Sequence, residues 1–329
     1  MNRLQLTLGT WNYDRVAPLQ DGRVRIEGVE LRTITLRIEE LFHRVFRHHE
    51  FDIVEMSLSA YLSEIAKGPW IYRAIPIFLS RIFRHSAIFV RADRDIDEPR
   101  DLRGKRVGVP EYSQTAGMTA RGILQDEYGV TPAEIEWVNG GLEEPGRTDK
   151  VNLQLPGDVR ITAATHAGLS TMLEAGELDA IISAANPSCF RPGGVVRRLF
   201  PDYRTVESAW YRKTGIFPIM HVVGIRSALV EEHAWLAASV TKAFEQAKRV
   251  TLDDIDGAGG ANKATVPWLA ADVEEARELM GEDWWPYGVA RNRRALDAAV
   301  RWSYEQGLTA RRLEVQELFV PSTLMKFKI

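Results

Sequence analysis

The hydrophobic pattern of the chain alternates between two kinds of segment. Short runs rich in Leu, Ile and Val, such as residues 4–10 and 29–36, are typical of buried strands. Segments with apolar residues at helical spacing, such as 38–50 and 59–68, are typical of amphipathic helices. With a short apolar run at 51–59, the chain opens in the order strand, strand, helix, strand, helix. This order predicts a mixed α/β fold.

A charged and turn-rich stretch that begins at Asp93 separates two series of such elements. Two more buried strands, at 71–80 and 86–92, are predicted before it. The stretch contains Pro99 and Gly104, and turn-rich segments of this kind often connect domains. Beyond it we expect a strand at 106–109, a helix at 116–128, a strand at 135–139, a helix at 168–176 and a strand at 178–184.

The remaining segments complete a two-lobed arrangement. The loop 140–162 is long for a bare connector, and we expect it to hold a short hairpin. The apolar segment 215–225 has the composition of a central strand, and the chain after it is mainly helical. The economical arrangement has domain I at 1–93 and 189–329, and domain II at 94–188. Two α/β lobes joined by two crossings form a central cleft, into which the carboxyl ends of the strands direct their loops.

Composition narrows the class of protein. The chain has 329 residues, 45% of them hydrophobic and 26% charged, which is ordinary for a globular protein with two cores. Its net charge of -3, with both signs mixed, predicts neither a nucleic-acid partner nor a membrane partner. Cys189 is the single cysteine, which excludes an internal disulfide and a thiolate zinc cluster. The first residues lack the apolar core of a secretory signal, so we expect a cytoplasmic protein.

The stretch VGVPEYSQTAG at 107–117 is the first candidate binding element. The chain has no GxGxxG opening a βαβ unit, no GxxxxGK[ST], no HExxH and no GxSxG, so common cofactor and hydrolase motifs are absent. In this stretch a predicted strand delivers Ser113, Gln114 and Thr115 to the start of a helix. Unpaired N–H groups and the helix dipole favour an anion there. The alternative is that Ser and Thr act as ordinary helix caps.

Two histidines are candidates for acid–base chemistry. His85 lies with Arg84 between two apolar runs, where it either serves an acidic ligand or pairs with a carboxylate as internal structure. His221 lies in an otherwise apolar strand, either as a core histidine or as a residue of the cleft. A cleft histidine can donate or accept a proton near neutral pH. The other histidines are predicted to be surface or structural residues: His43, His48, His49, His166 and His233.

Two strand ends supply further candidates. Trp11, Tyr13, Asp14 and Arg15 follow the first strand, and this combination suits an aromatic polar ligand. The alternative is a turn with a surface ion pair between the acid and the base. The serines Ser57 and Ser59 lie at another strand-to-helix junction, where either helix capping or ligand contact is expected.

Six motifs, in order between residues 83 and 308, resemble the 4,5-dihydroxyphthalate decarboxylase family: FRHSAIFV, VGVPEYSQTAGMTARGIL, RLFPDYRTVE, GIFPIMHVV, GEDWWPYG and YEQGL. The similarity runs nearly end to end, from TWNYDR and DGRV to ELFVPSTL. The resemblance implies a type II periplasmic-binding-protein-like fold. It also implies a cytoplasmic carboxy-lyase of phthalate degradation, which converts 4,5-dihydroxyphthalate to protocatechuate and carbon dioxide. The chain departs from the family pattern at Ser113-Gln114 and at Gly117-Met118-Thr119, within the expected binding loop.

A mechanism consistent with this resemblance needs no cofactor, because a ring hydroxyl para to the reacting carbon can accept the electron pair. We expect His85 or His221 to protonate the ring carbon, and the other histidine or Asp14 to take the phenolic proton. The retained carboxylate and the ring would be bound by Trp11, Tyr13, Arg15, Ser57, Ser59, Arg84, Ser113, Gln114 and Thr115. No metal-ligand set is recognisable, although a catechol and a phthalate are both chelating groups.

Two alternatives remain open from the sequence. The chain resembles in fold the solute-binding proteins, so a non-catalytic binding or sensing protein for an aromatic carboxylate is the main alternative. A menaquinone-pathway enzyme of the same fold is the second, and the six motifs disfavour it. A homo-oligomer is compatible with the sequence.

Overall fold

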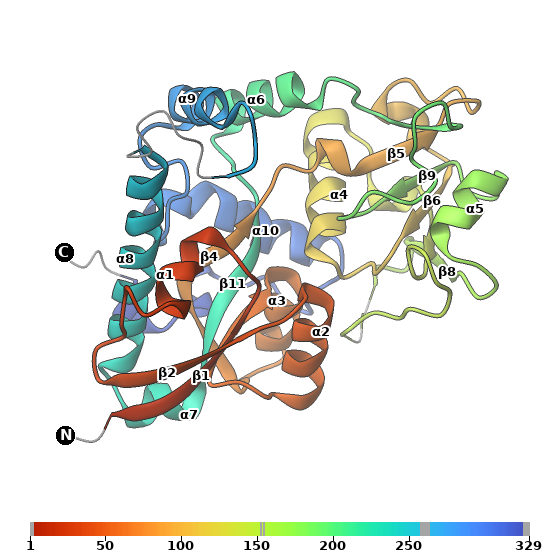
Figure 1. Cartoon of the computed structure of the whole chain (residues 1–329). Coiled ribbons are helices and arrows are strands. Elements are labelled where there is room, and N and C mark those ends of the chain that lie inside the picture. Colours follow the sequence, from red (N-terminus) through yellow and green to blue (C-terminus); the bar gives the residue numbers. More distant parts are fainter. Residues whose placement is uncertain (1–2, 152, 154, 257–263, 325–329) are drawn as a thin grey trace.

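The structure, a computed structural model, describes residues 3–151, 153, 155–256 and 264–324 and consists of two α/β lobes side by side (Figure 1). The first sheet has the order β2-β1-β3-β11-β4. Its strands are β1 (Leu4–Thr10), β2 (Val29–Thr35), β3 (Ile53–Ser57), β4 (Tyr72–Arg81) and β11 (Ile219–Arg226). Strands β1, β2 and β3 are parallel, and β11 runs antiparallel between β3 and β4. The predicted central strand in 215–225 is therefore confirmed.

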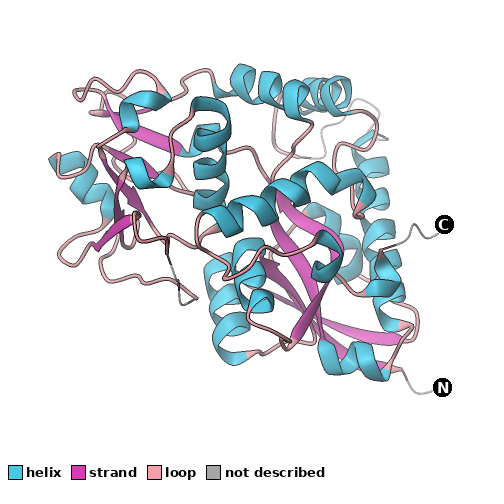
Figure 2. Ribbon diagram, turned by 180° about the vertical axis from the view of Figure 1, so that it is seen from behind, coloured by secondary structure: helices cyan, strands magenta, loops and turns pink. Residues whose placement is uncertain are grey.

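The second sheet is smaller and has the order β10-β5-β9-β6-β7-β8. Its strands are β5 (Ile88–Arg91), β6 (Arg106–Val109), β7 (Glu136–Asn139), β8 (Arg160–Ala163), β9 (Ala180–Ile182) and β10 (Val196–Arg198). Figure 2 shows both sheets from behind, each flanked by helices. The mixed α/β class predicted from the hydrophobic pattern is confirmed.

Helices cover both sheets, and contacts among three of them join the lobes. The helices are α1 (Ala17–Gln20), α2 (Ile38–His43), α3 (Leu58–Ala66), α4 (Thr115–Tyr128), α5 (Leu169–Ala175), α6 (Tyr203–Thr214), α7 (Ser227–Glu232), α8 (Leu236–Asp256), α9 (Leu269–Met280) and α10 (Arg293–Glu305). Helix α8 contacts β4, and α10 contacts β11. Helix α4 follows β6 of the second lobe but packs against α3 and α10 of the first. The lobes therefore share part of their core.

The two crossings lie between β4 and β5 and between β10 and β11. The sequence placed the boundaries at 93/94 and 188/189 instead. Strand β5 pairs with β9 and β10, so both flanks of the predicted domain II belong to the second sheet. The charged stretch after Asp93 is consequently a loop within the second lobe, with a short 3₁₀ turn at Pro99–Leu102.

The predicted hairpin in the loop 140–162 is wrong. Its described residues form no strand before β8, and β8 adds to the sheet edge parallel to β7. A parallel edge strand needs a long connection rather than a tight turn, which accounts for the length of this loop.

Candidate functional site

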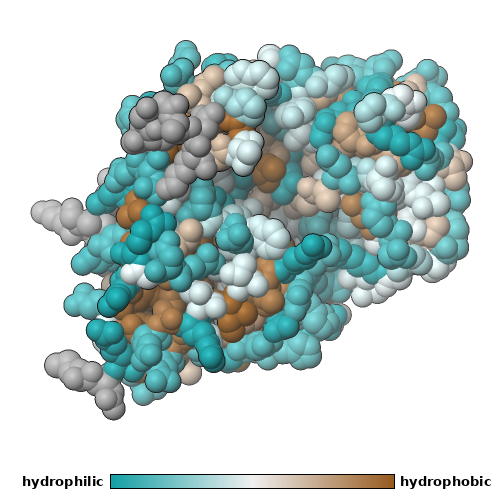
Figure 3. All heavy atoms as spheres, in the orientation of Figure 1, coloured by the Kyte–Doolittle hydropathy of each residue, from teal (hydrophilic) through white to brown (hydrophobic). Residues whose placement is uncertain are grey.

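A cavity of about 330 Å³ lies between the lobes, a size that suits a substituted benzene ring. In the space-filling view the surface is hollowed where the two lobes meet (Figure 3). The cavity is lined by Trp11, Tyr13, Ile38, Glu39, Phe42, Ser57, Ala60, Ser80, Arg84, Glu111, Ser113, Gln114, Thr115, Ala116, Arg147, Lys150, Ala184, Ala185, Met220 and His221. Strand ends, the start of α4 and loops of the second lobe thus converge on one space.

Most of the residues proposed from the sequence lie in this lining. The structure brings together Trp11, Tyr13, Ser57, Arg84, Ser113, Gln114, Thr115 and His221. It leaves four proposed residues outside the lining: Asp14, Arg15, Ser59 and His85.

His221 lies on β11 and lines the cavity. The pairing of β11 with β4 shifts register on both sides of His221, an irregularity that redirects a side chain. Nδ1 of His221 lies 2.6 Å from Oε1 of Glu55, and the Phe42 ring packs against the imidazole with its edge at 4.8 Å between centroids. Nε2 is therefore the ring nitrogen that remains for a ligand, because Nδ1 is already paired.

Glu55 on β3 is a fully buried carboxylate that the sequence analysis missed. Besides facing His221, it accepts hydrogen bonds from the Tyr13 hydroxyl at 2.7 Å, the Trp11 N–H at 3.1 Å and the Thr10 hydroxyl at 3.3 Å. Burial alone would raise its pKa, but the hydrogen bond and charge of His221, with the Tyr13 hydrogen bond, hold the pKa of Glu55 below its usual value. Glu55 thus provides a buried carboxylate as the hydrogen-bond partner of Nδ1 of His221. The signal in the sequence was an acid within an otherwise apolar strand.

Arg84 supplies a buried positive charge to the cavity. Only 7% of its surface is exposed, and its Nε donates to the Met220 sulfur at 3.2 Å. Burial lowers the pKa of Arg84 to about 10, so the guanidinium stays charged at neutral pH. It forms no ion pair with any carboxylate among the residues that the structure describes. Glu207 acts on its charge without forming an ion pair, so the guanidinium keeps the capacity to bind an anionic ligand.

The start of α4 borders the same cavity. Its N-cap, Gln114, makes no side-chain capping hydrogen bond, and the buried Oε1 of Gln114 has no partner in the described structure. The first N–H groups of the helix, from Thr115 onward, are those that an α-helix leaves without internal partners. Both features are consistent with the anion site expected in this stretch.

The hydroxyl groups near this helix start connect the lobes to each other. Thr115 Oγ1 lies 2.9 Å from Ser57 Oγ and accepts a hydrogen bond of 3.1 Å from the Ser59 N–H at the start of α3. The Ser59 hydroxyl donates to the Ser113 carbonyl, and the Ser113 N–H donates to Asp149 at 2.6 Å. Thr115 thus accepts from the first turn of α3 and Ser59 bonds to the backbone before α4, so both side chains are used between the lobes.

A third charged group in the lining consists of Glu111, Arg147 and Lys150, all missed by the sequence analysis. Glu111 has a 3% exposed side chain and pairs with Arg147 at 2.5 Å and with Lys150 at 2.5 Å. Arg147 also reaches Glu39 on α2 of the first lobe at 2.7 Å. The two cations come from the irregular part of the loop 140–162, so no periodic pattern could place them.

Asp14 and Arg15 form the surface pair given as their alternative. The Asp14 side chain is 58% exposed and lies 2.9 Å from the Arg15 guanidinium. Arg15 donates from Nε to the Leu79 carbonyl at 2.8 Å and lies between the rings of Tyr13 and Trp285, at 4.2 and 4.1 Å from their centroids. The Arg15 guanidinium is therefore bound by groups of the first lobe, and the Asp14 carboxylate is exposed to solvent.

His85 is part of the packing between the two crossings. Its ring is buried, with the Phe200 and Trp210 rings at 5.2 and 5.5 Å between centroids. Neither ring nitrogen has a hydrogen-bond partner, and the nearest carboxylate, Glu207, is 4.0 Å from Nδ1. Burial lowers the pKa of His85 to about 4, so the ring is neutral at pH 7. A buried neutral ring outside the cavity lacks both the charge and the position of a proton donor.

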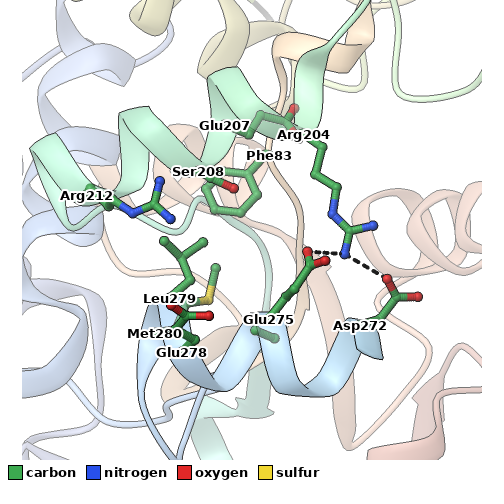
Figure 4. Close-up of a pocket in the computed structure, with 11 residues that line it drawn as sticks. Phe83, Arg204, Glu207, Ser208, Arg212, Asp272, Glu275, Glu278, Leu279 and Met280 are labelled. Atoms are coloured by element: carbon green, nitrogen blue, oxygen red, sulfur yellow. Dashed lines mark hydrogen bonds and ion pairs between the residues drawn. The ribbon is translucent and has the colours of Figure 1, made fainter. Parts of the chain in front are cut away.

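A second cavity, of about 310 Å³, lies between α6 and α9. Figure 4 shows Arg204 of α6 directed at Asp272 and Glu275 of α9, at 2.7 and 2.5 Å. Its cation is thus exposed and already paired, unlike Arg84. Elsewhere in the described chain no group of three or more His, Cys, Asp and Glu side chains is arranged to hold a metal ion. No helix within the described ranges is both long and apolar enough to cross a membrane.

Solved structures show the fold. The putative periplasmic sulfonate-binding protein SsuA of Methylobacillus flagellatus KT superposes with a TM-score of 0.56 at 13% identity, over 98% of this chain and 93% of that one. The desulfurization enzyme DSZB superposes with a TM-score of 0.51 at 16% identity, over 98% of each chain. At such identities the likeness confirms the two-lobed periplasmic-binding-protein-like fold and says nothing of activity.

Sequence relatives show the family. A family model described as NMT1/THI5 like matches residues 80–155. The 4,5-dihydroxyphthalate decarboxylase of Pseudomonas putida is 45% identical over 214 residues, which cover 64% of this chain and 83% of that protein. The protein of the same name from Comamonas testosteroni is 44% identical over 331 residues, covering the full length of both chains. On this full-length identity, the chain belongs to the 4,5-dihydroxyphthalate decarboxylase family.

Proposed function

We propose that this chain decarboxylates 4,5-dihydroxyphthalate to protocatechuate and carbon dioxide. One observation carries the proposal: an imidazole backed by a buried carboxylate and an unpaired buried guanidinium face the same interlobe cavity. The first group can deliver a proton, and the second can hold a carboxylate. The name of the full-length relatives supports this choice of substrate.

The chemistry requires a proton at the ring carbon that loses carbon dioxide. His221 donates it from Nε2, while Glu55 stabilises the imidazolium from the opposite side of the ring. The protonated ring places positive charge on the para hydroxyl, whose proton then leaves to give a dienone. When the carbon–carbon bond breaks, its electron pair restores the aromatic ring and leaves negative charge on the para oxygen, which then regains its proton. One proton is consumed for each carbon dioxide released.

Arg84 holds the carboxylate that is retained. Its guanidinium only donates hydrogen bonds and remains charged, so a carboxylate is the complementary group. The N–H groups at the start of α4 line the same cavity and add a second source of donors. Fixing this end of the ring positions the other carboxylate-bearing carbon for His221.

The test follows carbon dioxide release and ring absorbance with purified protein and 4,5-dihydroxyphthalate. We expect His221→Ala to lower kcat by about 10² to 10⁴-fold, the usual contribution of general acid catalysis. Arg84→Met should mainly raise KM. The matched control, His43→Ala on the exposed face of α2, should leave kcat unchanged. Wild-type turnover in His221→Ala would contradict the assignment.

The same assay separates the enzyme from a solute-binding protein, which would bind the diacid and release no carbon dioxide. The cytoplasmic location, the independence from cofactor and metal, and a homo-oligomeric state remain predictions from the sequence.

A further inference from the structure

We propose that Glu111, with Lys150 and Arg147, binds the hydroxyl end of the substrate and receives the phenolic proton. The inference rests on the proposed function, because it takes a ring that carries carboxylates at one end and hydroxyls at the other. It fills the role of phenolic base, for which the exposed Asp14 is badly placed.

Hydrogen-bond complementarity decides which end of the ring meets which part of the cavity. A carboxylate only accepts hydrogen bonds, and the phenolic groups are the only O–H donors of the ionised substrate. Glu111 can therefore bind the hydroxyls and repels the carboxylates. Arg84 only donates, so it binds a carboxylate. The two charged groups together orient the ring.

Glu111 is also the carboxylate with acceptor capacity left inside the cavity. Its Oε1 accepts from Arg147 Nε at 2.6 Å and from Lys150 at 2.5 Å, whereas among the described residues its Oε2 accepts only from Lys150, at 2.7 Å. Two carboxylate oxygens offer about four lone-pair sites, so Oε2 can take a further donor. Glu55, in contrast, is fully buried and surrounded by four partners. Glu39 lies at the rim with its side chain 75% exposed.

The two cations suit the charge changes at the para oxygen. When the ring carbon is protonated, the O–H bond at the para position breaks and Glu111 takes the proton. When carbon dioxide leaves, negative charge returns to that oxygen, and Lys150 lies beside the carboxylate to stabilise it. Glu111 then returns the proton, so the group ends each cycle unchanged.

Binding of two unreactive probes tests this assignment without any need for turnover. Protocatechuate carries one carboxylate and two hydroxyls, and benzoate carries the carboxylate alone. Isothermal titration calorimetry should show protocatechuate binding at least about tenfold more tightly to the wild type, as expected for a hydrogen bond to a charged acceptor. In Glu111→Gln we expect this ratio to fall below about threefold, while benzoate binds equally or more tightly because the cavity loses a negative charge.

Glu39→Gln is the matched control. It removes the same charge from the same arginine but lies at the rim, so the ratio of the two dissociation constants should stay as in the wild type. A ratio unchanged by Glu111→Gln, or abolished by both variants, would overturn the proposal. If circular dichroism shows that Glu111→Gln does not fold, Glu111→Asp keeps the charge and shortens the side chain. This variant should lower the ratio of the two dissociation constants and leave benzoate binding unaffected. An unchanged ratio in Glu111→Asp would equally overturn the proposal.

The outcome is separable from that of the proposed function. A ratio that depends on Glu111 in a protein that releases no carbon dioxide would refute the decarboxylation and keep the hydroxyl site. Carbon dioxide release with a ratio indifferent to Glu111 would refute the hydroxyl site alone.

Discussion

At the residue scale, the site depends on the fully buried carboxylate of Glu55. Glu55 faces Nδ1 of His221 at 2.6 Å, so replacing it by Gln keeps the size and removes the counterion of the imidazolium. We expect Glu55→Gln to lower kcat by about 10²-fold. Steady-state measurement of kcat at pH 7 tests this effect.

Tyr13→Phe is the comparison for this prediction. It removes one of the donors to Glu55 but leaves the carboxylate beside His221. Burial, followed by Glu55, raises the pKa of Tyr13, so its hydroxyl is a fixed donor and no proton relay is lost. The loss of kcat should therefore be smaller than in Glu55→Gln. An equal kcat in Glu55→Gln and the wild type would exclude the positioning role.

The same scale shows why sequence reasoning found only part of the site. His221 and Arg84 were proposed because polar residues beside apolar runs are unusual, and both line the cavity. Glu55 gave the same signal within β3. Arg147 and Lys150 gave none, because they lie in an irregular loop and are held by ion pairs to Glu111, 36 and 39 residues earlier.

At the element scale, the burial of His85 between the two crossings makes the free energy of unfolding depend on pH. The pKa of His85 is about 4 in the folded protein and about 6.5 in an unfolded chain. Between these values the unfolded state binds the proton and the folded state does not, so stability falls as pH falls from about 6.5 to about 4. At pH 5 the loss attributable to His85 is about 2 kcal/mol. The charged groups around it are Glu207, whose pKa burial raises, and the neighbouring Arg84.

His85→Phe should remove this dependence, since a phenyl ring suits the space between Phe200 and Trp210 and has no proton to bind. Urea unfolding at pH 7 and pH 5 gives the comparison. We expect the free energy of unfolding to fall by about 2 kcal/mol less in the variant than in the wild type. Identical losses in both proteins would show that His85 does not titrate in this window.

The crossings also mark the limit of element prediction from this sequence. Strands with strong apolar runs, such as β3, β4 and β11, were predicted close to their observed bounds. The charged stretch after Asp93 resembles a domain boundary, yet antiparallel pairing of β5 with β9 and β10 places it inside the second lobe. Such pairing joins segments about 90 to 110 residues apart, and no local pattern encodes it.

At the scale of the whole molecule, helix α4 makes the two lobes one folding unit. Arg121 on α4 is buried, and its Nε donates to Gln306 beyond the end of α10 at 2.8 Å. Gln306 in turn donates to the Met118 carbonyl at 2.9 Å. These buried polar bonds cross the lobe boundary in both directions. Because their loss would leave polar groups buried without partners, separation of the lobes is costly.

Gly122 tests whether the two lobes unfold together, because it packs against Trp302 of α10. A Cβ at Gly122 would lie 2.3 Å from the Trp302 indole. Alanine favours a helix over glycine by about 1 kcal/mol, but an overlap of this depth in a packed core costs about 1–3 kcal/mol, so we expect Gly122→Ala to be destabilising overall. Gly157→Ala, where a Cβ meets nothing within 4 Å, should leave stability within about 0.5 kcal/mol of the wild type.

The shape of the urea unfolding transition shows whether the two lobes unfold together. Urea unfolding of Gly122→Ala should remain a single step, with tryptophan fluorescence and circular dichroism giving the same lowered midpoint. Because α4 also begins at the cavity, its displacement should raise KM for the diacid. Two separate transitions would mean that each lobe is stable alone. An unchanged midpoint would mean that the packing between α4 and α10 accommodates the added methyl group without a loss of stability.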